Sequence, residues 1–111
     1  MRTLAEIRDL LDELEHQPAN TLEDQDLDFK EWNSRSMTGS VSMVVDMAVC
    51  MANGGGGTVV FGVNDKAIGR KTAIIGVPPE VDINRLKKVV YDSTDPRLTP
   101  AFEELRVLEG T

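Results

Sequence analysis

The chain has 111 residues, 41% hydrophobic and 28% charged, and its formal net charge is −7 at pH 7. This length supports one small domain with a single core and excludes a second domain of ordinary size. No apolar run approaches the roughly 20 residues of a membrane-spanning helix. The single cysteine, Cys50, excludes an internal disulfide, and one cysteine with one histidine cannot form a tetrahedral zinc site alone. These features predict a cytoplasmic protein with no membrane partner.

The negative charge is concentrated in the N-terminal third. Residues 1–31 contain ten acidic and three basic side chains, whereas residues 32–111 contain nine of each. Affinity for nucleic acid comes mainly from neutralising phosphates with Lys and Arg. Any contact with nucleic acid is therefore predicted on the neutral two-thirds of the chain.

The N-terminal residues 1–19 predict an amphipathic helix. Thr3 and Glu6 have the spacing of a capping box, and leucines and isoleucine follow at helical spacing to about His16. Beyond it, residues 22–32 predict a strand, because Leu27 and Phe29 alternate with polar residues.

Residues 41–52 are apolar almost all round, which predicts a buried helix. Asn53-Gly54 is expected to end it in the left-handed conformation. The β-branched run at residues 58–63 predicts a core strand. Cys50, within the helix, is interpreted as a packing residue.

The C-terminal third predicts a short strand at 74–77, a helix at 83–92 capped by Asp82, and a strand at 102–108. The sequence thus predicts an α+β fold, with a mixed β-sheet packed against helices 41–52 and 83–92. Because residues 109–111 read as a turn with no strand after it, we expect the domain at 20–111 to be truncated at its C-terminal end.

Three motifs occur in order along the chain. Glu23 is followed five residues later by Asp28-Phe29-Lys30, Ala48–Asn53 runs into four glycines, and Val59–Gly62 leads into Val63-Asn64-Asp65. This combination resembles the Schlafen Alba-type DNA-binding domain, also known as a divergent AAA domain. Asp28 stands where that family has Glu, and four glycines stand where two are typical.

The resemblance implies a DNA-binding module of a bacterial transcriptional regulator or helicase-related protein. In vertebrate Schlafens a related fold carries a metal-dependent RNA endonuclease, and its metal-binding acids correspond to Glu23, Asp28 and Asp65. Phosphodiester hydrolysis with Mg²⁺ or Mn²⁺ requires such oxygen ligands from separate elements. Glu23 has the wrong parity to share a strand face with Asp28, so the strand would have to begin after Glu23. Solvated surface acids are the alternative interpretation.

Basic residues form two groups, which are the candidates for nucleic-acid binding. One follows the core strand and the other lies on the third predicted helix: Lys66, Arg70 and Lys71, then Arg85, Lys87 and Lys88. If the two groups lie together they offer a surface for phosphates; otherwise each is a solvated face. Tyr91 and Trp32 are isolated in the sequence, so no platform for base stacking is predicted.

The glycines at 54–57 are predicted to be a tight structural connection and not a phosphate-binding loop, because a helix precedes them and no Gly-Lys-Ser/Thr follows. No cofactor is expected, apart from Mg²⁺ or Mn²⁺ if the nuclease alternative holds. A nucleic-acid-binding module is the leading function. A metal-dependent endoribonuclease-like domain and a protein-interaction or dimerisation module are the alternatives, with a homodimer or a further domain expected as partner.

Overall fold

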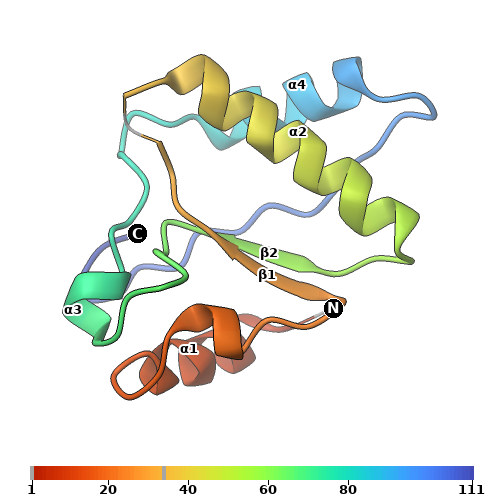
Figure 1. Ribbon diagram of the computed structural model, residues 1–111. Helices are drawn as coiled ribbons and strands as arrows, with labels where there is room; N and C mark the ends of the chain where they lie inside the picture. The colour runs from red at the N-terminus through yellow and green to blue at the C-terminus, as the bar shows by residue number, and fades with distance from the viewer. Residues whose placement is uncertain (1, 34) are drawn as a thin grey trace.

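The computed structural model describes residues 2–33 and 35–111, which form a small parallel sheet with helices on both sides (Figure 1). Strands β1 (Leu27–Lys30) and β2 (Thr58–Phe61) pair in parallel, with Leu27 opposite Thr58. Helix α1 (Leu4–Glu13) lies on one side of the sheet. Helices α2 (Met37–Asn53) and α4 (Ile83–Ser93) lie on the other, and they pack against each other. The remaining helical segments are short: η1 (Ala19–Thr21) and α3 (Arg70–Ala73).

Two apolar clusters fill the spaces on either side of the sheet. On the α1 side, Ile7, Leu11 and Leu14 pack with Leu27 and Phe29 of β1. The N-terminal helix therefore shares a core with the strand that follows it. Alternation along β1 turns its other residues, Asp28 and Lys30, toward the α2 side.

The second cluster joins α2 and α4 to the sheet. Trp32 and Val44 are buried with Leu86 and Val90 of α4. The ring of Trp32 meets that of Phe61 edge-on, with centroids 6.3 Å apart. Trp32 is therefore a core residue.

Caps set the beginnings of the three longer helices as local chemistry requires. Thr3 and Glu6 form both bonds of the predicted capping box of α1. Ser36 Oγ accepts a hydrogen bond from Gly39 N at the start of α2. Asp82 caps α4 as predicted, accepting from Asn84 N at 2.9 Å.

The α+β class is confirmed, but the sheet is smaller than predicted. The described residues contain one pair of parallel strands, and antiparallel pairing is limited to isolated bridges such as Val63–Ile74. Residues 74–77 therefore form no strand of their own. The segment 102–108 was also predicted as a strand, and that prediction is wrong: only Val107 makes a bridge, to Gly110.

The prediction that residues 41–52 are buried all round is also wrong. Only Ser40 and Val44 of α2 are buried, and Val49 is 38% exposed. Two strands are too narrow to cover several faces of a helix, so its outer apolar residues meet solvent. The helix ends at Asn53 as expected, but the left-handed residues are Gly55 and Gly56, since Gly54 has a φ of −86°.

No helix in the described ranges is both long and apolar enough to cross a membrane.

Candidate functional site

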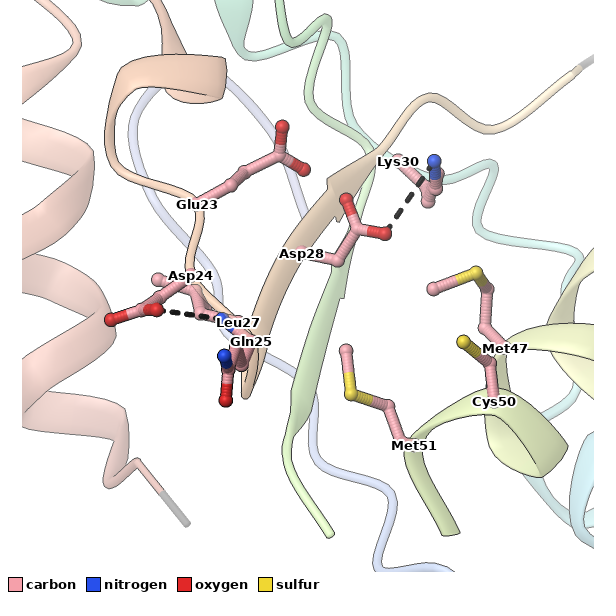
Figure 2. A pocket seen from close by; sticks show the side chains of 9 residues that line it. All are labelled: Glu23, Asp24, Gln25, Leu27, Asp28, Lys30, Met47, Cys50 and Met51. Carbon is pink, nitrogen blue, oxygen red and sulfur yellow. Dashed lines mark hydrogen bonds and ion pairs between the residues drawn. The ribbon is translucent and has the colours of Figure 1, made fainter. Parts of the chain in front are cut away.

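The three candidate carboxylates come from three segments around the sheet. Glu23 precedes β1, Asp28 lies on β1, and Asp65 follows β2. The strand does begin after Glu23, as the parity argument required. Glu23 Oε2 accepts a hydrogen bond from the backbone N–H of Phe29 at 3.0 Å, and this bond holds its carboxylate beside β1 (Figure 2).

The surroundings of Glu23, which include the other two acids, change its pKa. Burial raises the pKa of Glu23, and the neighbouring carboxyl group of Asp28 raises it further. The bond from Phe29 N lowers this pKa, while the negative charges of Asp28 and Asp65 raise it. Asp28 also forms an ion pair with Lys30, its Oδ2 lying 3.5 Å from Nζ.

The carboxylates do not form a closed metal site. Among residues 2–33 and 35–111, no three or more Asp, Glu, His or Cys side chains are arranged to hold a metal ion. Carboxylate oxygens are nevertheless the ligands that hard divalent cations such as Mg²⁺ and Mn²⁺ prefer. The metal-binding role of these residues therefore stays a prediction.

A hollow of about 390 Å³ lies between β1 and α2 (Figure 2). Glu23 and Asp28 line it on the strand side. Met47, Cys50 and Met51 line it on the helix side. Cys50 is exposed, so its interpretation as a buried packing residue is wrong. The helical spacing of these three residues would have indicated a shared face, but the sequence does not show which strand that face meets.

One member of the first basic group, Arg70, forms ion pairs within the protein. Arg70 is only 19% exposed, and its Nε and Nη2 donate to the two carboxylate oxygens of Glu109 at 3.0 Å each. Its Nη1 donates to Asp12 of α1. Lys66 and Lys71 are exposed nearby. The charge of Arg70 is therefore balanced by carboxylates of the protein.

The second basic group lies on the outer surface of α4. Arg85, Lys87 and Lys88 are all exposed. Lys88 Nζ lies 2.7 Å from Oδ2 of Asp92, one turn further along the helix. This lysine lowers the pKa of Asp92, and the nearby charge of Arg97 adds to the effect.

The two basic groups do not form one surface. Figure 1 shows α3 near α1, and α4 beside α2 on the opposite side of the sheet. The acidic helix α1, with four acids and one arginine, thus lies near the first group and away from the second. The condition for a joint phosphate surface is not met, and α4 carries the more accessible positive charge.

The profile of the family described as Schlafen, AlbA_2 matches residues 23–111. No curated protein and no solved structure matches the chain. The matched region begins at Glu23 and includes the whole sheet, α2 and α4. The chain therefore belongs to the Schlafen, AlbA_2 family.

Proposed function

We propose that this protein is a nucleic-acid-binding module of a transcriptional regulator, and that the outer face of α4 contacts phosphates. Family membership is consistent with a nucleic-acid-binding domain. The observation that carries the proposal is the exposed position of Arg85, Lys87 and Lys88 on a helix separated from acidic α1 by the sheet. DNA is the expected ligand, and the cytoplasm is the expected location.

The charges on α4 itself support contact with a polyanion. Helix α4 contains three cations and one acid, Asp92, although the whole chain has a net charge of −7. Phosphate contacts need only a locally positive electrostatic potential. The negative charge of α1 lies across the sheet, and salt screens it over about 10 Å at 0.1 M. Lys87 makes no ion pair with any described residue, so its ammonium group is available to a ligand.

Reversing the charges of α4 tests the proposal. In Lys87→Glu/Lys88→Glu, we expect affinity for duplex DNA to fall strongly. The slope of log Kobs against log salt should also decrease by about one for each lysine lost. The measurement is fluorescence anisotropy over a series of salt concentrations.

Lys66→Glu/Lys71→Glu is the matched control, because it makes the same change in net charge near α1. We expect this variant to retain most of the affinity and slope. An equal loss in both variants would mean that only net charge matters and would contradict the assignment to α4. Wild-type protein that does not bind even at low salt would leave the protein-interaction or dimerisation alternative, including a homodimer.

The position of Glu23 and Asp28 on one hollow beside β1 favours a second candidate, a metal-dependent endoribonuclease-like function. In this function Glu23, Asp28 and Asp65 would hold Mg²⁺ or Mn²⁺, which would supply charge stabilisation for phosphodiester cleavage. The role of these side chains is to provide oxygen ligands, with Phe29 N–H keeping the Glu23 carboxylate in place.

Asp65→Ala tests this candidate with two readouts. We expect wild-type protein to show a Mn²⁺-dependent increase in Tm and cleavage of single-stranded RNA, and the variant to lose both. Asp24→Ala is the control, because Asp24 is an exposed acid outside the proposed ligand set. Identical Mn²⁺ responses in wild type and Asp65→Ala would exclude a metal site at these carboxylates.

A further inference from the structure

Tyr91 projects from the same exposed face of α4 as the two lysines. It is the only tyrosine of the chain, and it is 46% exposed. Lys87 and Lys88 precede it by four and three residues, the spacings that place helical side chains side by side. An accessible aromatic ring therefore lies about one helical turn, roughly 5 Å, from the proposed phosphate contacts.

Arg97 is held against the ring of Tyr91. The Cζ atom of its guanidinium lies 4.9 Å from the ring centroid. Its Nη1 also donates a hydrogen bond to the backbone carbonyl of Tyr91 at 2.8 Å. The two contacts bring together a ring and a planar cation, which are the side-chain types on which nucleobases stack.

A buried residue fixes the turn that brings Arg97 back over α4. Thr94 is 7% exposed, and its Oγ1 donates to Val90 O at 2.8 Å. The same Oγ1 accepts a hydrogen bond from Leu98 N at 2.9 Å. The chain is therefore anchored on both sides of Arg97, and the position of the guanidinium does not depend on its contact with Tyr91 alone.

The acid within α4 does not oppose a ligand at this position. Asp92 is paired with Lys88, and Arg97 contributes a second positive charge close to it. Single exposed aromatic residues are common on protein surfaces and need no special explanation. Here the ring is accompanied by an anchored guanidinium and by two lysines on the same face, a combination that suits both the base and the phosphate of a nucleotide.

We infer that Tyr91 and Arg97 form a platform on which an unpaired nucleobase stacks, while Lys87 and Lys88 contact the adjacent phosphates. This inference rests on the proposed function and specifies its ligand: single-stranded nucleic acid, or a duplex with an unpaired base. Bases within an intact duplex are stacked on one another, so they cannot use the platform. The surface should therefore prefer single strands.

The test uses the whole chain with an oligonucleotide of about 10 nucleotides, a length within the site sizes of single-strand-binding domains. Fluorescence anisotropy gives Kd for the single strand and for a blunt duplex of the same sequence. Tyr91→Ala removes a stacking side chain, so this variant should bind the single strand about 10-fold more weakly, or weaker still. Duplex binding should change less than about 2-fold, because its phosphate contacts remain. Tyr91→Phe should keep the wild-type preference, since the ring and not the hydroxyl stacks.

Arg97→Lys keeps the charge and removes the planar group. We expect it to weaken single-strand binding without reducing duplex binding. Equal effects of Tyr91→Ala on both ligands, or no effect on either, would overturn the platform while Lys87→Glu/Lys88→Glu could still support the phosphate contacts. If wild-type protein binds neither ligand at low salt, the proposed function itself fails and the platform with it. The same measurements with DNA and RNA strands of matching sequence show which sugar the surface accepts.

Discussion

At the scale of single residues, the surroundings of each cation decide whether it is available to a ligand. Arg70 and Lys88 are both paired with carboxylates, but Arg70 is 19% exposed while the side chain of Lys88 is 76% exposed. The partners of Arg70 lie 39 and 58 residues away, in the C-terminal turn and in α1. Arg70 therefore ties distant segments together, whereas the exposed pair of Lys88 and Asp92 can exchange for a phosphate at little cost.

The pair of Arg70 and Glu109 predicts a pH dependence of stability. Hydrogen bonding to Arg70 lowers the pKa of Glu109 below its ordinary value of 4.5. An acid with a lowered folded-state pKa stabilises the protein above its unfolded pKa, and this contribution disappears as pH falls through the folded-state pKa. We expect Glu109→Gln to unfold at a lower urea concentration than wild type near pH 7, and expect the difference to be smaller near pH 3.

Urea denaturation followed by tryptophan fluorescence measures this difference, since Trp32 is buried in the core. Glu104→Gln is a suitable control, because Glu104 is exposed and makes no ion pair with a described residue. A difference for Glu109→Gln that is the same at both pH values would show that the side chain acts through packing instead of charge.

At the scale of helices and strands, the sequence predicts an element correctly where the signal for that element depends only on neighbouring residues. The caps at Thr3 and Asp82, and the strand alternation around Phe29, depend on residues within a few positions of each other. These elements were predicted correctly. The apolar composition of α2 indicated a helix, but its burial depends on how many strands lie against it, and local sequence does not contain that number.

The segment 102–108 shows the same limit for strands. Its apolar residues suggested a strand, yet a strand exists only when a neighbouring edge pairs with it. In the structure this segment borders an apolar hollow of about 1140 Å³ beside β2, and Leu108 is fully exposed. The outer edge of β2 is therefore unpaired along Val59 and Phe61, among the residues that the structure describes.

The candidate site was predictable only in part for the same reason. The motifs named Glu23, Asp28 and Asp65, and in the structure the charges of Asp28 and Asp65 raise the pKa of Glu23. The sequence did not show that the two basic groups lie on opposite sides of the sheet. Nor did it show that Arg97 folds back over Tyr91, because the turn at Thr94 depends on hydrogen bonds to both flanking segments.

At the scale of the whole molecule, the sheet separates two surfaces of different charge. Acidic α1 lies on one side, and basic α4 lies on the other beside α2. The hollow between β1 and α2, with its carboxylates, is separate from the exposed face of α4 that carries Lys87 and Tyr91. Binding to phosphates and any metal chemistry would therefore use different parts of one small domain.

The proposed binding surface is tested most directly by a titration of isotopically labelled protein with a short DNA strand, followed by amide chemical shifts. We predict that the largest changes occur between Lys87 and Leu98, on α4 and the turn that holds Arg97. The amides of α1 should change little, because the sheet lies between that helix and the proposed surface. Changes centred on α1 or α3, or none at DNA concentrations that saturate a weak site, would contradict the assignment of α4 as the nucleic-acid-binding surface.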